Sequence, residues 1–261
     1  MAIIVEIMGL PGSGKTMASA ILARALREKR VAAWNRREVV LACIRRRPYG
    51  WIKGLLKRLP TVVWEPWLGS QTAFIEYVGF TVLHPNLLKL LADWTIQSGW
   101  GEQKRHGILW AFALLFAEAE LIRRHAPNDG VVLFDEGAAH RGFSLFGYLP
   151  PDRVSGDVIS NYVDAIPLPQ AVVWMDADVE SCMRRLDERS HFPLLAQGGT
   201  TEDIRIQLQH GQVVVGLIAS ALAQKGVPVW RVDNRDGSQA ESTERLIRQV
   251  IPQIMEIQCP L

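Results

Sequence analysis

The sequence predicts an α/β fold in which helices cover both faces of a mostly parallel sheet. Two observations lead to this prediction. Short β-branched runs alternate along the chain with longer stretches that have one apolar face, which is typical of parallel strands joined by crossover helices. The composition, with 48% hydrophobic and 21% charged residues, is that of a globular chain with a large core. It argues against a disordered, collagen-like or fibrous protein.

Four apolar runs are the clearest predicted strands. They span Ile3–Ile7, Val131–Phe134, Val172–Met175 and Val227–Val232. Another strand is expected just before Arg36. Stretches with apolar residues at helical spacing lie between and after these runs. They predict helices over Lys15–Glu28, Val179–Arg189, Ile204–Gln224 and Glu241–Ile257, and a further long helix that ends near His125.

The chain of 261 residues suits a single domain over 1–261 that carries a large insert. Roughly a hundred residues separate the first helix from the strand at Val131, far more than a crossover needs. We therefore expect a helical insert over about 36–128. Charge is segregated as well, because Arg24–Arg58 holds twelve Lys or Arg and two Glu although the formal net charge is only +2. Seven of the nine tryptophans lie between the first helix and Val131.

The strongest motif is GLPGSGKT at Gly9–Thr16, which matches G-x-x-x-x-G-K-[ST], the Walker A pattern, between a predicted strand and a predicted helix. Glycines let the backbone curl so that its N–H groups point at an anion at the positive end of the helix. Lys15 is expected to reach the β- and γ-phosphates, and the Thr16 hydroxyl to bind Mg²⁺. The predicted nucleotide-binding residues are Gly9, Pro11, Gly12, Ser13, Gly14, Lys15 and Thr16.

An acidic pair, Asp135 and Glu136, follows the strand at Val131–Phe134. A carboxylate at this position can hold a metal ion or accept a proton from an attacking hydroxyl. The other interpretation is an acidic cap on the next helix. We expect Asp135 to bind the metal together with Thr16, and the sequence does not decide which of the two carboxylates is the base.

Two further segments make the sequence resemble the P-loop kinases of small molecules, the nucleoside-monophosphate and thymidylate kinase-like group. VVWMDADVE, at 172–180, followed by Arg185 and Arg189, looks like the fourth strand of that group and the helix that leads into its arginine-bearing lid. VPVWRVDN, at 227–234, is similar to the last strand, whose following loop lies near the adenine.

This resemblance covers residues 1–34 and 131–255 in outline. It implies a three-layer P-loop NTPase fold with sheet order 2-3-1-4-5, ATP and Mg²⁺ as cofactors, and transfer of the γ-phosphoryl group to a small acceptor. It further implies that Asn234 contacts the nucleotide and that a lid spans about 184–202.

Arg185 and Arg189 are four residues apart and so project from one face of a helix. Forked guanidinium groups suit the charge that develops on a transferring phosphoryl group, although a solvated basic face is the alternative. The chain departs from the kinase group after its acidic pair. Thymidylate kinases there show Asp-Arg and deoxynucleoside kinases Glu-Arg-Ser, whereas the next arginine here is Arg141. Whether Arg141 turns back to bind the substrate stays open.

The chain also resembles uncharacterised P-loop kinase-like proteins linked to bacterial surface-polysaccharide synthesis, through GLPGSGKT, DEG, PLP and VVWMDAD. That resemblance implies a sugar-related acceptor. Arg36 and Arg37 stand at the carboxyl end of the second strand, where this fold places its acceptor. They could bind an anionic acceptor such as a sugar phosphate, a uronate or a nucleotide, or they could form a solvated charged turn.

Residues 45–58 mix cations with bulky apolar side chains, a pattern that suits a surface of anionic lipid. A helical hairpin packed on the core is favoured over such a peripheral membrane contact. No nucleic-acid partner is expected, because the pI is only about 8.5 and no motif is present. A homodimer stays open.

Three widely spaced cysteines exclude a disulfide framework and a cysteine-rich zinc site. The first residues have no basic region or cleavage site, so a signal peptide is not expected. The longest apolar stretches, Ile108–Ala117 and Val213–Ala223, fall short of the roughly 20 residues of a spanning helix. We expect a cytoplasmic protein.

These features together predict an ATP-dependent phosphotransferase that acts on a hydroxyl or phosphate of a small, sugar-related or nucleotide-like acceptor. The alternative is a nucleotide-switched regulatory ATPase or binding protein without a small-molecule acceptor. A sulfotransferase-like enzyme is disfavoured, because Lys15, Thr16 and Asp135 together suit metal-bound ATP.

Overall fold

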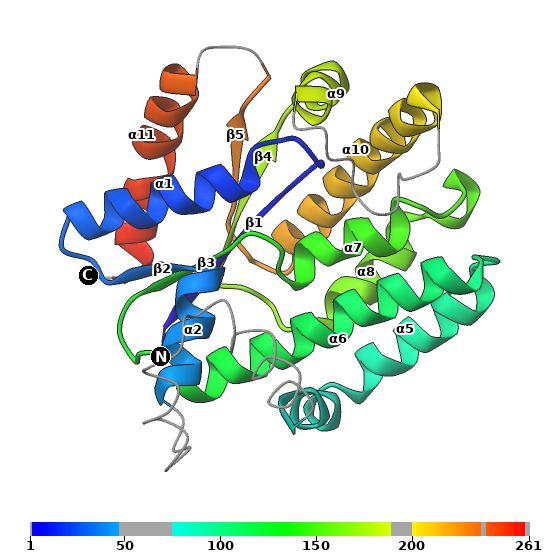
Figure 1. The fold of residues 1–261 in the computed structure, drawn as a ribbon, viewed down its shortest axis with the longest axis horizontal. Coiled ribbons are helices and arrows are strands. Elements are labelled where there is room, and N and C mark those ends of the chain that lie inside the picture. The colour runs from blue at the N-terminus through cyan, green and yellow to red at the C-terminus, as the bar shows by residue number, and fades with distance from the viewer. Residues whose placement is uncertain (1, 47–74, 189–199, 236–238, 259–261) are drawn as a thin grey trace. The chain divides into compact units, whose positions relative to one another are not determined.

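The chain forms two compact units in a computed structural model (Figure 1). The structure describes residues 2–46, 75–188, 200–235 and 239–258. The sheet unit consists of Ala2–Asn35 and Asp129–Leu261, and the helical unit of Arg36–Asn128. Residues 47–74 of the predicted insert and 189–199 of the predicted lid lie outside the described residues. The single domain with an insert and a lid stays a prediction.

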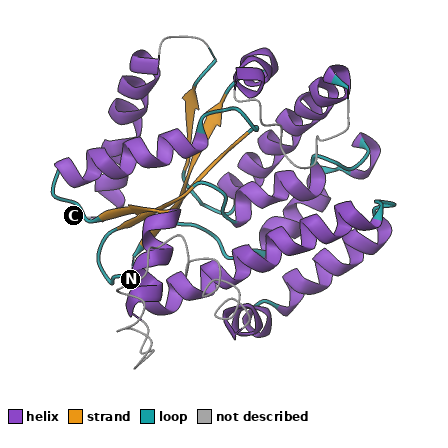
Figure 2. Cartoon of the chain, viewed as in Figure 1, coloured by secondary structure: helices purple, strands orange, loops and turns teal. Residues whose placement is uncertain are grey.

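The sheet unit is built on five parallel strands, which Figure 2 shows surrounded by helices. They are β1 (Ile3–Gly9), β2 (Ala33–Asn35), β3 (Val131–Phe134), β4 (Ala171–Asp176) and β5 (Val229–Asp233). Their order is β2-β3-β1-β4-β5, and every neighbouring pair is parallel. This confirms the predicted P-loop NTPase fold with sheet order 2-3-1-4-5. Because all strands run the same way, their carboxyl ends meet at one edge of the sheet.

Helices cover both faces of this sheet. They are α1 (Lys15–Glu28), α7 (Ala138–Phe146), α8 (Gly156–Ala165), α9 (Val179–Glu188), α10 (Thr201–Gln224) and α11 (Gln239–Gln258). A short 3₁₀ helix spans Pro151–Arg153. Figure 1 shows α1 and α11 on one face and α7, α8 and α10 on the other. Helix α10 begins earlier than predicted, because the Thr200 side chain and Asp203 form a capping box.

Helix α7 escaped the sequence analysis for a physical reason. Eight of its residues, among them His140 and Phe143, are buried. The helix spans only nine residues and contains Gly142, so it is shorter than the roughly 11–18 residues over which a helical period can be recognised in a sequence. The short helix α8 was not predicted either.

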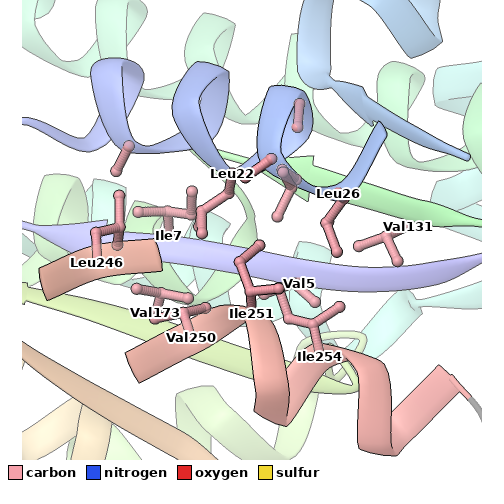
Figure 3. Close-up of a cluster of buried hydrophobic side chains, with 14 of the residues drawn as sticks. Val5, Ile7, Leu22, Leu26, Val131, Val173, Leu246, Val250, Ile251 and Ile254 are labelled. Atoms are coloured by element: carbon pink, nitrogen blue, oxygen red, sulfur yellow. The ribbon is translucent and has the colours of Figure 1, made fainter. Parts of the chain in front are cut away.

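The core between the sheet, α1 and α11 follows from the alternation of side chains along β1. Successive residues of a strand point to opposite faces, so Val5 and Ile7 share one face and Glu6 lies on the other. Figure 3 shows the labelled side chains of this cluster pointing toward one another. They are Val5, Ile7, Leu22, Leu26, Val131, Val173, Leu246, Val250, Ile251 and Ile254.

Helix α10 is, within the described residues, long and apolar enough to cross a membrane, with a mean hydropathy of 1.3 over its most apolar part. The estimate from Val213–Ala223 alone was too short, because the helix extends over 24 residues. A core helix of a soluble protein has the same length and composition. Helix α10 packs against α7 and α8, and nine of its residues are buried, as in such a core helix.

The helical unit contains α2 (Arg36–Arg46), helical residues 75–83, α5 (Pro85–Gln97) and α6 (Glu102–His125). Helix α6 ends at His125, as the sequence predicted, and packs against α2. Phe80 and Phe116 stack with ring centroids 4.3 Å apart, and Phe112 meets Phe116 edge-on. These aromatic side chains form a core within the helical unit.

Truncating a side chain in the core cluster should destabilise the fold. Ile251→Ala removes methyl groups from a residue that is 1% exposed, and we expect the free energy of unfolding to fall by about 2–5 kcal/mol. Urea denaturation followed by tryptophan fluorescence measures this change. Gln249→Ala, at an exposed position of the same helix, should stay within about 0.5 kcal/mol, and equal losses in the two variants would contradict the assigned core.

Candidate active site

The loop Gly9–Lys15 connects the central strand β1 to the first turn of α1. The Ser13 N–H donates to the Leu10 carbonyl at 3.0 Å, which closes the loop on itself. Gly12 and Gly14 have φ values of 81° and 91°, in the left-handed region that favours glycine. Gly14 is also the N-cap of α1. The backbone N–H groups of the loop therefore gather at the positive end of a helix.

Lys15, the first residue of α1, lies over this loop. Its Nζ donates to the carbonyls of Gly9 at 3.1 Å and Leu10 at 2.9 Å. Burial lowers the pKa of Lys15 to about 8, while the charges of Glu136 and Asp135 partly oppose this shift. The structure thus brings a desolvated cation close to the acidic pair that the sequence singled out.

The acidic pair follows β3 directly, and β3 is a parallel neighbour of β1. The Arg141 guanidinium donates to Glu136 Oε2 at 2.7 Å, which balances the charge of this carboxylate. Asp135 makes no hydrogen bond or ion pair with any other described residue. Its half-buried carboxylate is therefore available to a metal ion or an acceptor, whereas Glu136 is held by Arg141.

Arg185 and Asn234 lie against the phosphate-loop residues. The Asn234 side-chain nitrogen donates to the Ser13 carbonyl at 2.8 Å, and its backbone N–H donates to the Asp176 carbonyl at 2.7 Å. Arg185 donates to the Asn234 carbonyl at 3.0 Å and more weakly to the Gly12 carbonyl at 3.4 Å. The structure shows Asn234 bracing the phosphate loop, and its contact with a nucleotide base stays a prediction.

The remaining predicted arginines are Arg189, Arg36 and Arg37. Arg189 lies outside the described residues. Arg36 and Arg37 begin α2 of the helical unit, where Arg36 donates to both carboxylate oxygens of Glu118 at 2.6 and 3.1 Å. An anionic acceptor would have to compete with Glu118 for Arg36. A role of Arg36 and Arg37 in acceptor binding stays a prediction.

A third acidic side chain closes the same edge of the sheet at the end of β4. Asp176 is buried and accepts hydrogen bonds from Arg231 at 2.7 Å and Arg235 at 2.9 Å. Burial raises its pKa, but the hydrogen bonds and charges of the two arginines outweigh burial and lower it. The Arg231 guanidinium also lies 4.9 Å from the ring centre of Trp174. This carboxylate is thus neutralised within the protein.

Glu6 is a buried residue of this region that the sequence analysis missed. Its carboxylate accepts hydrogen bonds from the backbone N–H groups of Ala138 and Ala139. Burial raises its pKa to about 7, although these hydrogen bonds oppose the shift. A signal was present, because Glu6 interrupts the apolar run Ile3–Ile7 of a strand that was predicted to be covered on both faces.

His140 also lies near Lys15 and Arg141 but is unsuited to act as a base. Burial and the charges of these two cations hold its pKa well below the ordinary value, so the ring stays neutral. Its Nδ1 has no hydrogen-bond partner among the described residues, and the same holds for Ser13 Oγ and Arg141 Nε. Buried polar atoms are nearly always hydrogen-bonded, so these three fit a site that takes a polar ligand.

The oxygen groups at this edge also fit a metal-bound nucleotide. Thr16 is exposed in the first turn of α1, and Asp135 offers a carboxylate. Mg²⁺ prefers oxygen ligands and needs only one or two protein groups when phosphates and water supply the rest. Within the described residues, no group of three or more His, Cys, Asp or Glu side chains could hold a metal ion by itself.

Comparisons with known proteins find similarity only among solved structures. No model of a known protein family matches the sequence, and no curated protein matches it. The chain is similar to deoxyadenosine kinase from M. mycoides with bound dCTP (TM-score 0.47, 10% identity, 96% of this chain and 100% of that chain). The same enzyme with bound dATP has a TM-score of 0.45, and with dCMP and dCDP bound 0.48, each at 11% identity over 97% of this chain and 100% of that chain. At these identities and TM-scores the likeness says nothing of the substrate of this chain.

Removing the brace of the phosphate loop should lower stability. Asn234→Ala leaves the buried Ser13 carbonyl without its donor, and we expect the free energy of unfolding to fall by about 1–3 kcal/mol. Urea denaturation measures the loss. Asn161→Ala, at an exposed position of α8, serves as control and should change little. A loss no larger than that of the control would contradict the bracing role.

Glu6 should make stability depend on pH. Its pKa is raised from 4.5 to about 7 in the folded protein, so its contribution is fully present below about pH 4.5 and is lost as the pH rises through about 7. The loss amounts to up to about 3 kcal/mol. Urea denaturation between about pH 5 and pH 8 should show the natural protein losing stability relative to Glu6→Gln. A difference that does not change with pH would contradict a raised pKa.

Proposed function

We propose that this protein is an ATP-dependent phosphotransferase that transfers the γ-phosphoryl group of Mg·ATP to a hydroxyl or phosphate of a small acceptor. One observation carries the proposal. Lys15 and the pair Asp135–Glu136 stand at the carboxyl ends of two neighbouring parallel strands, close enough for their charges to shift the pKa of Lys15. Phosphoryl transfer needs a cation that binds the phosphates, and carboxylates nearby that bind a metal ion and orient the acceptor.

The loop Gly9–Lys15 binds the phosphates in this proposal. Mg·ATP supplies the phosphoryl group and a metal ion that offsets charge on its oxygens. The loop N–H groups and the N-terminus of α1 attract the anion, and the unpartnered Ser13 Oγ can join them. The Lys15 ammonium would exchange its hydrogen bonds with Gly9 and Leu10 for phosphate oxygens.

The two carboxylates of the acidic pair would have different roles, one in metal binding and one in orienting the acceptor. Thr16 and Asp135 are the proposed metal ligands, and the choice of Asp135 follows from its free carboxylate. Glu136 would orient the acceptor hydroxyl. Its carboxylate is held in position by the Arg141 guanidinium, which donates to Glu136 Oε2 at 2.7 Å. Full proton removal is not required early, because phosphoryl transfer passes through a loose transition state. Positioning and electrostatics would carry most of the rate.

Arg185 is the proposed source of positive charge beside the phosphate loop. It already donates to the Gly12 carbonyl, and Arg189, four residues later in the sequence, is the second arginine proposed for this role. Guanidinium groups at this place would neutralise charge on the transferring group. For the acceptor we propose a sugar-related or nucleotide-like molecule in the cytoplasm, with Arg36 and Arg37 as its contacts if it is anionic.

The experiment is ADP release from Mg·ATP in the presence of nucleosides, nucleoside monophosphates, sugars and sugar phosphates. We expect one class of acceptor to stimulate release. Lys15→Ala should lower the stimulated rate by about 10²–10³-fold, because a donor to the transition-state charge is lost. Its circular dichroism should stay that of the natural protein. Lys29→Ala, an exposed position at the end of the same helix, is the matched control and should keep the rate.

Two outcomes would contradict the proposal. Stimulated release that survives in Lys15→Ala would show that the phosphate loop is not the site of transfer. A panel without any stimulation, combined with tight ATP binding, would instead favour the regulatory ATPase that the sequence analysis left as the alternative.

A further inference from the structure

Glu6 occupies the middle of the sheet, where charged residues are rare. In the parallel register of β1 it is level with Phe134 of β3 and Val172 of β4, and only 4% of its surface is exposed. A carboxylate in such a place is costly unless its oxygens are bound. The groups that bind the oxygens of Glu6 therefore indicate why a carboxylate stands at this buried position.

Both oxygens of Glu6 bind the first turn of α7. Oε1 accepts from the Ala138 N–H at 3.0 Å, and Oε2 accepts from the Ala139 N–H at 2.8 Å. The N-cap of this helix is Gly137, which has no side chain that could cap it. An acidic group from a strand 132 residues away in sequence thus takes the place of a local cap, at the end of the helix where negative charge is favoured.

The fit around this carboxylate is close. A Cβ atom at Gly137 would collide with the Glu6 carboxyl group, so a larger residue there would displace either this carboxylate or the turn that it caps. From the other side, the buried Tyr162 hydroxyl donates to the Ala138 carbonyl at 2.6 Å. The first turn of α7 is therefore held between β1 and α8.

The clamped turn directly follows the acidic pair. Asp135 and Glu136 are joined to it through Gly137 alone, and Arg141 of the same helix holds Glu136 at 2.7 Å. At its other side, Glu6 lies three residues before Gly9, where β1 becomes the phosphate loop. One carboxylate thus ties the strand that carries the phosphate loop to the segment that carries Asp135 and Glu136.

We propose that Glu6 is a positioning residue that holds Asp135 and Glu136 in place beside the phosphate loop, so that the Mg²⁺-dependent part of ATP binding depends on it. The proposal rests on the function proposed above, in which Asp135 is a metal ligand. Glu6 acts through the α7 turn, and neither the nucleotide nor the metal needs to touch it.

The test is calorimetric titration of the protein with ATP, with and without Mg²⁺, at pH 8, where Glu6 is ionised. Glu6→Gln keeps the shape of the side chain but turns an amide N–H₂ toward one of the two backbone N–H donors. We expect Mg·ATP affinity to fall about tenfold, as for other residues that orient a metal ligand. Affinity for ATP without Mg²⁺ should stay within about twofold, because the phosphate loop is intact.

Ser155→Ala is the matched control. It removes the side-chain cap of α8, the hydrogen bond from the Val158 N–H, and leaves both hydrogen bonds between Glu6 and α7 in place. A general loss of helix stability would affect this variant as well, whereas both of its affinities should stay those of the natural protein. A second variant, Tyr162→Phe, removes only the hydroxyl on the other side of the clamped turn and should show a smaller, about threefold, loss confined to Mg·ATP.

Three results would overturn the positioning role. These are unchanged Mg·ATP affinity in Glu6→Gln, an equal loss with and without Mg²⁺, or no effect of Mg²⁺ on ATP binding by the natural protein. If Glu6→Gln does not fold, Tyr162→Phe decides, and its unchanged Mg·ATP affinity overturns the role. Failure of the proposed function gives a different result. If no acceptor stimulates ADP release but Glu6→Gln still loses affinity only for Mg·ATP, the proposed kinase activity is contradicted and the positioning role of Glu6 is not.

Discussion

Parallel pairing of β1 with β3 and β4 is the constraint on which the candidate site depends. Parallel strands end at the same edge of a sheet. The loop after β1 and the acidic pair after β3 therefore become neighbours although they lie far apart in the sequence. Asp176 at the end of β4 and Asn234 just after β5 join them for the same reason. A chain with the same motifs in antiparallel strands would place them at opposite edges. The register of the central strand is therefore what converts separate motifs into one site.

Charge at this edge of the sheet is balanced locally. Lys15 is held by loop carbonyls and by the nearby acidic pair, Glu136 by Arg141, and Asp176 by two arginines. Desolvating a charge is expensive, and hydrogen bonds with opposite charges offset that expense only when the geometry is kept. Glu6 stands out because the hydrogen bonds that its carboxylate accepts come from neutral backbone groups, and burial raises its pKa to about 7 although these hydrogen bonds oppose the shift. A buried group that lowers stability, as the Glu6 carboxylate does, is typical of places where a protein needs fixed geometry.

The sequence predicted the elements whose signals are local. The structure confirms the alternation of strands and helices, the limits of α1 and the end of α6 at His125. It also confirms the strand order that the P-loop kinase resemblance implied. Helix α7 was missed because its nine residues are too few to establish a helical period, and α10 proved longer than its apolar stretch because a capping box extends it. The missing information lay in the shortness of one helix and in the terminus of the other.

By itself the sequence determined the glycine-rich loop Gly9–Thr16 and the acidic residues at a strand end, because adjacent residues specify both. Only the tertiary structure decided what the charged side chains touch. Glu6 meets a helix 132 residues further on, Asn234 reaches back 221 residues to Ser13, and Arg36 is taken up by Glu118 at a separation of 82. These partners follow from strand register and helix packing, which bring distant segments together by burying apolar surface shared by many residues. No local pattern around Glu6, Asn234 or Arg36 carries that information.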